Sequence, residues 1–104
     1  MGGHPGTTLQ GYDIQFGTNH MGHALLLLEL LIPLLLGTAS NISSPPRVIS
    51  LSSNGHGHAA ALPPGGIAFS ILKSSPPELS SVNKYTQSIL VNILYALQYA
   101  LQYL

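Results

Sequence analysis

The run RVISL at residues 47–51 is the feature that most limits what this chain can fold into. It is rich in apolar and β-branched residues and lies between Pro45-Pro46 and the turn-forming sequence SSNG, as expected for a buried β-strand. One strand cannot form a sheet, because its backbone donors and acceptors need partners on neighbouring strands. The open edges of such a strand favour association with other chains. We therefore expect this chain to be part of a larger arrangement.

Helical and loop patterns surround the predicted strand. Residues 13–36 predict a helix in which apolar residues dominate from Met21, with a kink or end at Pro33 and a C-cap at Gly37. Residues 54–77 are rich in glycine and proline and predict a long loop, in which 67–72 could hold one short element. The order helix, strand, long loop, helix indicates an α/β fold with an incomplete sheet.

A second long helix is predicted over residues 81–104. One stripe of this helix, with spacings of three and four residues, is more polar than the rest, and the other faces are almost wholly apolar. We therefore expect the helix to be buried on most sides. Tyrosines at positions 95, 99 and 103 predict a packing stripe rather than a binding site. The polar stripe consists of Lys84, Ser88, Asn92, Tyr95, Tyr99 and Gln102.

The composition excludes several classes of function. Only 6% of the 104 residues are charged, against about 25% in an average soluble domain. Three basic residues cannot form a phosphate-binding patch, so no nucleic-acid partner is expected. Without cysteine, neither disulfides nor thiolate metal sites can form. The pairs His20/His23 and His56/His58 have no carboxylate or cysteine beside them, so we predict no metal site.

The most apolar run, residues 24–36, is the candidate for a membrane contact. It has 13 residues, including Glu29 and Pro33, whereas a helix that spans a bilayer needs about 20 apolar residues. The first 23 residues contain no Lys or Arg, contrary to a secretory signal peptide. We predict no transmembrane span and a cytoplasmic location, with peripheral membrane association as the alternative.

Three segments together resemble the short-chain dehydrogenase/reductase family: GYDIQFGTNHMGH (11–23), RVISLSSNGH (47–56) and KYTQSILVNIL (84–94). The most similar branch is the retinol-dehydrogenase-like or WW-domain-oxidoreductase-like one common in fungi. The resemblance implies part of a doubly wound Rossmann-type fold. It also implies NAD or NADP as cofactor, and hydride transfer between nicotinamide and a small alcohol or carbonyl substrate.

The resemblance also implies roles for single residues. The family's active-site tetrad of asparagine, serine, tyrosine and lysine places its first three members at Asn19, Ser53 and Tyr85. In the family the tyrosine exchanges a proton with the substrate oxygen, the serine orients that oxygen and the asparagine holds a relay water. Each residue also has an ordinary structural reading, as a helix cap, a turn residue or a partly buried aromatic.

Two family features are missing from the matching positions. The lysine that follows the tyrosine by four residues, and lowers the tyrosine's pKa in the family, is replaced by Ile89. Lys84 precedes Tyr85 directly and points to another side of a helix. No glycine-rich phosphate-binding turn after a strand is found either. Residues 1–104 are therefore expected to be a partial Rossmann domain without the N-terminal cofactor-binding half and the C-terminal substrate region.

These departures lead to competing predictions of function. The first is a truncated, inactive descendant of an NAD(P)-dependent oxidoreductase that binds no cofactor by itself. The second is an enzyme that works only when another chain supplies the missing half. The third is a non-enzymatic interaction or regulatory fragment that packs against a full-length relative. Self-association through residues 83–104 is a further expectation, because the corresponding helix often lies in dimer interfaces of the family.

Overall fold

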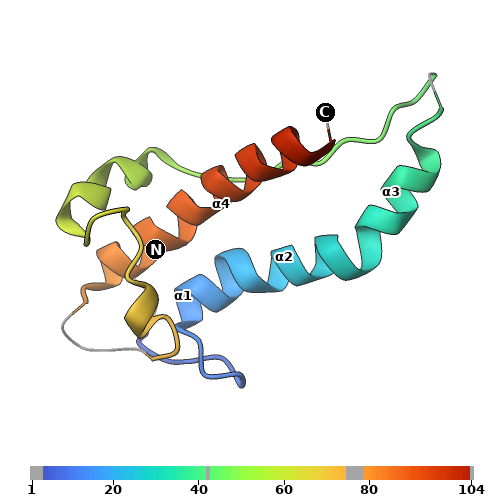
Figure 1. Ribbon diagram of the computed structural model, residues 1–104. Coiled ribbons are helices and arrows are strands. Elements are labelled where there is room, and N and C mark those ends of the chain that lie inside the picture. The colour runs from blue at the N-terminus through green and yellow to red at the C-terminus, as the bar shows by residue number, and fades with distance from the viewer. Residues whose placement is uncertain (1–3, 42, 75–78, 104) are drawn as a thin grey trace.

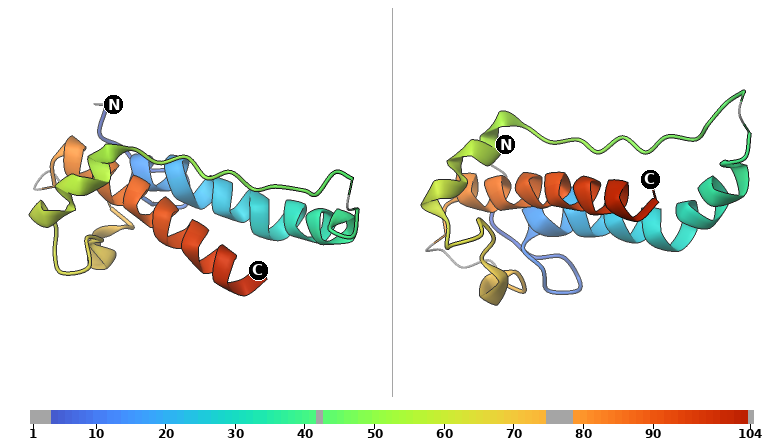
Figure 2. Two further views of the ribbon diagram at one scale, coloured as in Figure 1. Left: turned by 90° about the horizontal axis from the view of Figure 1, so that it is seen from above. Right: turned by 45° about the horizontal axis from the view of Figure 1, so that its top comes forward.

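The computed structural model describes residues 4–41, 43–74 and 79–103. Two long helices lie side by side, and an extended segment runs along them from the far end of the first helix back toward the start of the second (Figures 1 and 2). The molecule is elongated, with extents of 49 × 29 × 22 Å. No strand occurs in the described part of the chain, where the only β-type pairing is the single bridge between Thr7 and Asp13.

The first helix, here called the N-terminal helix, is continuous from Ile14 to Thr38. Its parts are α1 (Ile14–Phe16), a π-helical turn (Gly17–Met21), α2 (Gly22–Leu25), a second π-helical turn (Leu26–Leu31) and α3 (Ile32–Thr38). Asp13 begins it, because its carboxylate accepts hydrogen bonds from the backbone N–H groups of Gln15 and Phe16, at 3.0 and 3.2 Å. The sequence predicted this helix correctly to within two residues at its C-terminal end.

Pro33 changes the direction of the N-terminal helix without ending it. The helix bends between α2 and α3 (Figure 1), where Pro33 lies in the first turn of α3 and the preceding turn is π-helical. Proline cannot donate to the carbonyl one turn earlier, so a bend is the expected response. The predicted C-cap at Gly37 is wrong: Gly37 lies inside α3, and Ala39 is the residue that caps it.

The second helix, α4 (Ser81–Tyr103), confirms the predicted range, but not the predicted burial on most sides. Its buried residues are Lys84, Thr86, Gln87, Ser88 and Ile89, most of which are polar. Its apolar face is exposed and includes Leu97, at 57%, with Ile93, Leu94 and Leu101 along the same helix. These polar residues face inward because they find hydrogen-bond partners there: Ser88 bonds to Asn19 of the N-terminal helix, Thr86 to the Gly55 carbonyl and Gln87 to the Ala68 N–H.

The predicted strand at 47–51 is extended but unpaired. No backbone–backbone hydrogen bond within the described residues involves positions 45–52. Val48, Ile49 and Leu51 are 49%, 81% and 80% exposed. The local pattern favours an extended backbone, but a strand exists only where a second one pairs with it. The predicted sheet is therefore not confirmed, and the described chain is helical.

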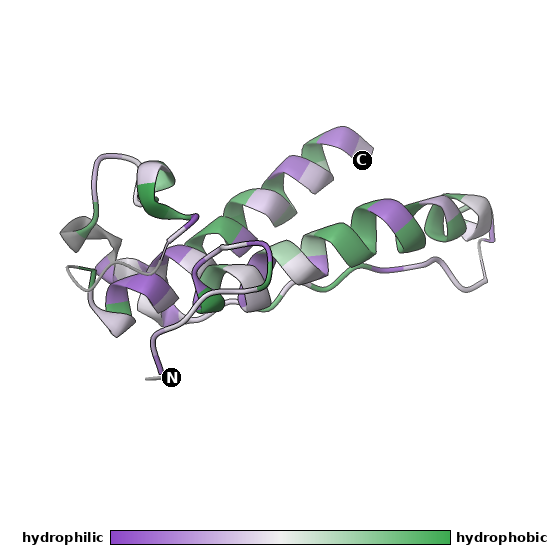
Figure 3. Cartoon of the chain, turned by 90° about the horizontal axis from the view of Figure 1, so that it is seen from below, coloured by the Kyte–Doolittle hydropathy of each residue, from purple (hydrophilic) through white to green (hydrophobic). Residues whose placement is uncertain are grey.

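The apolar core is small and lies at the start of both helices. Phe16, Ile67 and Leu72 form it, and Leu90 and Val91 of α4 pack against it. The glycine- and proline-rich loop supplies two of the three buried members, close to a short 3₁₀ turn (Phe69–Ile71) that confirms the predicted element within 67–72. A second 3₁₀ helix spans Asn54–Ala61, so this part of the range predicted as loop is helical instead. Away from this end, apolar side chains are largely exposed. The green ribbon in Figure 3 shows how many apolar residues the N-terminal helix carries.

The N-terminal helix is longer than the apolar run considered in the sequence. Its 25 residues include a window of mean hydropathy 1.8, so by length and composition it could cross a membrane. A core helix of a soluble protein and a signal sequence meet the same criterion. The predicted absence of a transmembrane span, based on a run of 13 residues, therefore does not follow from helix length.

The cap at Asp13 provides a test of this fold. Replacing Asp13 with Ala should lower the free energy of unfolding by about 1 kcal/mol, because two helix N–H groups lose their acceptor. Asp13→Asn keeps a capping oxygen and should therefore lower the free energy of unfolding by less. Urea titration followed by far-UV circular dichroism measures both variants. Equal losses in the two variants would show that capping is not the reason for the effect.

Candidate functional site

The side chain of Asn92 joins three separate segments. Its Nδ2 group donates to the backbone oxygens of Asn19 (3.0 Å) and Leu51 (3.1 Å), and its Oδ1 lies 3.0 Å from Nδ1 of His20. Because both amide hydrogens are used by carbonyls, Oδ1 is the acceptor and His20 Nδ1 carries the proton. Asn92 thus holds the N-terminal helix and the extended segment against α4.

Ser88 makes a second polar connection one turn earlier on α4. Asn19 Nδ2 donates to Ser88 Oγ at 2.9 Å, and this hydroxyl donates to the backbone oxygen of Tyr85 at 2.7 Å. Ser88 is fully buried. The side chain of Asn19, a predicted site residue, is therefore linked through Ser88 to the backbone of Tyr85, another predicted site residue.

Ser53 and Tyr85 come together around Gly55. A Cβ atom placed on Gly55 would lie 3.1 Å from Ile89 Cδ1, 3.4 Å from Tyr85 Cε1 and 3.5 Å from Ser53 Oγ. A side chain here would press on Ile89 Cδ1 and would lie in ordinary contact with the other two atoms. The Ser53 hydroxyl accepts from the Gly55 N–H at 3.2 Å, and Thr86 Oγ1 donates to the Gly55 carbonyl, also at 3.2 Å. The structure thus groups two predicted site residues with the position of the missing lysine.

A cavity of about 580 Å³ lies between the N-terminal helix, the extended segment and α4. Asn19 and Tyr85 line it, whereas Ser52, not Ser53, is the serine of the pair on its wall. Ser52 Oγ donates to the backbone oxygen of Ile89 at 3.0 Å, which fixes the end of the extended segment to α4. The predicted trio therefore shares one neighbourhood, but its serine lies outside the cavity. The remaining walls are mostly leucine side chains of the N-terminal helix, with Val48, Ile49 and Leu51 opposite.

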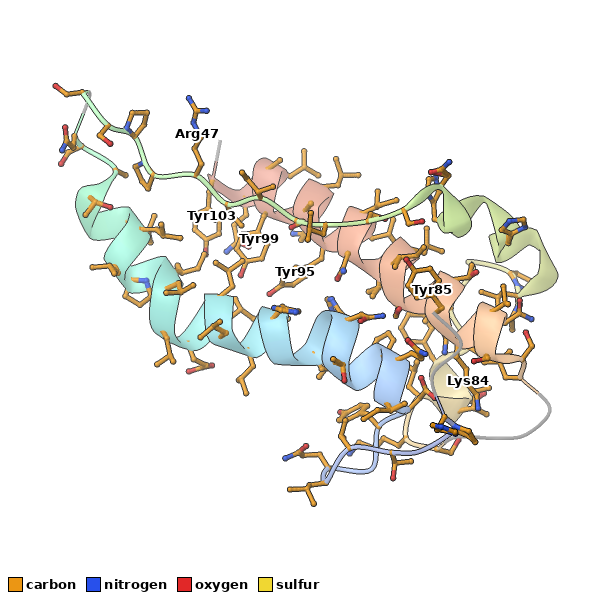
Figure 4. The ribbon with its side chains drawn as sticks, turned by 180° about the vertical axis from the view of Figure 1, so that it is seen from behind. Arg47, Lys84, Tyr85, Tyr95, Tyr99 and Tyr103 are labelled. Carbon is orange, nitrogen blue, oxygen red and sulfur yellow. The ribbon has the colours of Figure 1, made fainter. Side chains whose placement is uncertain are left out.

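A nicotinamide dinucleotide does not fit the groups described here. Ile89 is 4% exposed and has no donor for a ribose hydroxyl or charge to act on Tyr85. Lys84 is itself buried, and its side chain and that of Tyr85 leave α4 in different directions (Figure 4). Among the described residues that line the cavity, Arg47 is the only lysine or arginine.

An aromatic row continues from the polar contacts along α4. The ring of His20 packs edge-on against Phe16 and Tyr95, with centroids 5.4 and 5.0 Å apart. Tyr95 packs edge-on against Tyr99 at 4.7 Å, and Tyr99 stacks on Tyr103 at 5.5 Å. Figure 4 shows the three tyrosines between the two long helices. The predicted packing stripe is confirmed for these tyrosines.

Burial shifts two ionisable groups of this row. It lowers the pKa of His20, against the raising effect of its hydrogen bond to Asn92, and the neighbouring His23 lowers this pKa further. Burial also raises the pKa of Tyr95, and the hydrogen bond to Tyr99, 3.1 Å between the hydroxyls, adds to the rise. Tyr95 therefore stays neutral. The described residues contain no group of three or more histidines and carboxylates that could hold a metal.

Sequence reasoning missed the residues that assemble this site. In the sequence, Asn92 and Ser88 stand out only as members of a polar stripe, and His20 stands out as half of a histidine pair and as part of segment 11–23. One signal was present: Ser88 and Asn92 are four residues apart, so both face one side of α4. Their partners include backbone carbonyls, which no pattern of side chains reveals.

Comparison with known proteins finds relatives among oxidoreductases and short-chain dehydrogenases/reductases. The chain is 38% identical over 91 residues to a Neurospora crassa protein named as the mitochondrial oxidoreductase bli-4. It is 37% identical over 98 residues to a short-chain dehydrogenase/reductase of Armillaria gallica, and 36% over 89 residues to retinol dehydrogenase 13 of Homo sapiens. This chain is similar to one segment of short-chain dehydrogenase/reductase family members. The resemblance seen in the three sequence segments is thereby confirmed.

The matches cover most of this chain and a small part of each relative. They span 88%, 92% and 86% of the chain, but 21%, 29% and 23% of the three relatives. The relationship implies a Rossmann-type fold for the relatives, whereas the described residues here form helices without a sheet. No family profile and no solved structure matches the chain.

The lowered pKa of His20 predicts how stability depends on pH. Unfolding exposes His20 and restores its ordinary pKa of about 6.5, so the unfolded chain binds more protons below that pH. The contribution of neutral His20 is fully present above about pH 6.5 and is lost as the pH falls toward the folded-state pKa. Urea midpoints should therefore fall on acidification.

The matched control for this prediction is on the same helix. His20→Gln should flatten the pH dependence of the urea midpoint, since glutamine can donate to Asn92 but does not titrate. His23→Gln, at an exposed position, should leave most of the pH dependence of the urea midpoint unchanged. An unchanged pH dependence in the His20→Gln variant would contradict the assignment to His20.

Proposed function

We propose that this chain retains the residues that contact the substrate oxygen in a short-chain dehydrogenase/reductase site. In this form the chain does not itself catalyse NAD(P)-dependent oxidation or reduction. Tyr85, Ser53 and Asn19 would be its polar residues. The observation that carries the proposal is the grouping of Tyr85, Ser53 and Ile89 around Gly55. Tyr85 and Ser53 both lie near Gly55, which supports the roles that the resemblance implies, and the neighbouring isoleucine cannot replace the lysine.

The chemistry of these residues supports contact with an alcohol or carbonyl oxygen. A tyrosine hydroxyl and a serine hydroxyl can each donate one hydrogen bond to such an oxygen. Tyr85 also lines the apolar cavity, which suits a small, largely uncharged molecule. The relatives are oxidoreductases by name, so a general relationship to NAD(P)-dependent oxidoreductases supports the proposal.

A non-enzymatic role is the second candidate. The exposed apolar face of α4, with Leu94, Leu97 and Leu101, favours contact with another protein. A full-length relative, or a second copy through residues 83–104, would cover it. For location, we propose the cytoplasm, with peripheral membrane association through the exposed leucines of the N-terminal helix as the alternative.

A nicotinamide fluorescence titration tests the first candidate. Adding the purified chain to NADH or NADPH should not change the nicotinamide emission, because neither a ribose-binding donor nor a lysine charge is present at position 89. A purified relative with a complete tetrad is the positive control. Saturable binding with a Kd below about 1 mM by the unmodified chain would contradict the proposal.

Restoring the lysine at position 89 separates two causes of inactivity: the missing lysine itself, and the lack of other groups that fit the cofactor. Ile89→Lys should not give measurable alcohol oxidation with NAD or NADP, since the buried site offers no other group that fits the cofactor. Ile89→Met is the control for a long side chain without charge. Turnover in the lysine variant alone would show that position 89 is the only defect, and that the described residues do fit the cofactor.

A further inference from the structure

The extended segment 47–51 has one backbone edge directed at α4 and one directed away. In an extended chain the N–H and C=O of one residue point to the same edge, and successive residues alternate between edges. The Leu51 carbonyl accepts from Asn92 of α4 at 3.1 Å. By this alternation, the N–H and C=O groups of residues 47 and 49 belong to the same edge as the Leu51 carbonyl, and those of Val48 and Ser50 belong to the opposite edge.

The backbone groups on the outward edge of the segment are available to pair with another extended segment. No hydrogen bond to the backbone groups of Val48 or Ser50 occurs among the described residues. The segment is held extended at one end by Asn92 and by the bond from Ser52 Oγ to the Ile89 carbonyl. At the other end Pro46 lacks an N–H and limits the length of any ladder. An extended segment with open donors and acceptors is satisfied by another extended backbone.

We propose that this edge pairs antiparallel with the same segment of a second copy of the chain, with Ile49 at the two-fold axis. In that register Val48 of one copy faces Ser50 of the other, and each pair exchanges two backbone hydrogen bonds. Ile49 meets Ile49 of the partner, a β-branched pair that favours sheet pairing. The segment also lines the cavity beside Tyr85, but the pairing uses only its backbone groups and not the polar side chains of the proposed oxidoreductase site.

Charge and shape support a second copy as the partner. Antiparallel pairing about Ile49 places Arg47 opposite Leu51, so the two arginines do not face one another. The segment contains no other charge. Ile49 and Leu51 are 81% and 80% exposed, and the pairing would bring these apolar side chains of both copies together on one face. The interface is isologous, as a two-fold dimer requires.

Sedimentation equilibrium of the full chain, with a proline variant, tests the pairing. The unmodified chain should form a concentration-dependent dimer. Ser50→Pro should weaken it about tenfold or more, because each copy loses one donor to the partner. Ser50→Ala keeps the N–H and should dimerise as the unmodified chain does. A monomer at all concentrations, or equal weakening by both variants, would overturn the proposal.

Two further measurements keep the test independent of how the proline variant folds. Amide hydrogen exchange of the unmodified chain by NMR should show protection of Val48 and Ser50 on dimerisation, with Ile49 unchanged. Leu97→Glu, on the exposed face of α4, should leave the dimer intact. A dimer abolished by Leu97→Glu, or protection confined to α4, would assign self-association to that helix and overturn the strand pairing.

Discussion

The amide of Asn92 is the contact on which the rest of this structure depends. It connects α4 to a carbonyl and a histidine of the N-terminal helix and to a carbonyl of the extended segment. Each such hydrogen bond stabilises the folded chain by about 1 kcal/mol, and an unmet buried partner costs more. A small apolar core leaves few other ways to fix these segments. The bonds of Ser52 to the Ile89 carbonyl and of Asn19 to Ser88 fix the same segments beside it.

The inward orientation of polar residues explains the unusual surface. Ser88 and Asn92 use the inner side of α4 for hydrogen bonds, so the leucines at 94, 97 and 101 are left outside. Figure 3 shows the same excess of apolar residues along the N-terminal helix. With so few charged residues in the sequence, the chain has little else to place on its surface. Both the open strand edge and these leucines therefore favour contact with other molecules.

The helices were predictable because they depend on local signals. Asp13 caps the first helix, Pro33 bends it, and apolar periodicity marks α4. The sheet was not predictable, because pairing of residues 47–51 depends on a second strand that the described residues do not provide. Periodicity also shows which residues share a face without showing which face is buried. Which face of α4 is buried depends on the hydrogen-bond partners of Ser88 and Asn92, which lie far away in the sequence.

The candidate site was predictable in its residue types and less so in its assembly. The family resemblance named Asn19, Ser53 and Tyr85, and it identified Ile89 as the departure. It could not show that Gly55 brings Ser53, Tyr85 and Ile89 together, or that Ser52 rather than Ser53 lines the cavity. Those arrangements depend on how the turn after residue 52 packs against α4.

Thiol reactivity tests the central claim, the inward polar side of α4, most directly. The chain has no cysteine, so single Ser88→Cys and Leu97→Cys variants each carry one reporter. Ser88 is 0% exposed and Leu97 is 57% exposed. At dilutions where the chain is monomeric, a soluble disulfide reagent should therefore react slowly at position 88 and rapidly at position 97. Equal rates, or faster reaction at position 88, would contradict this account of the fold.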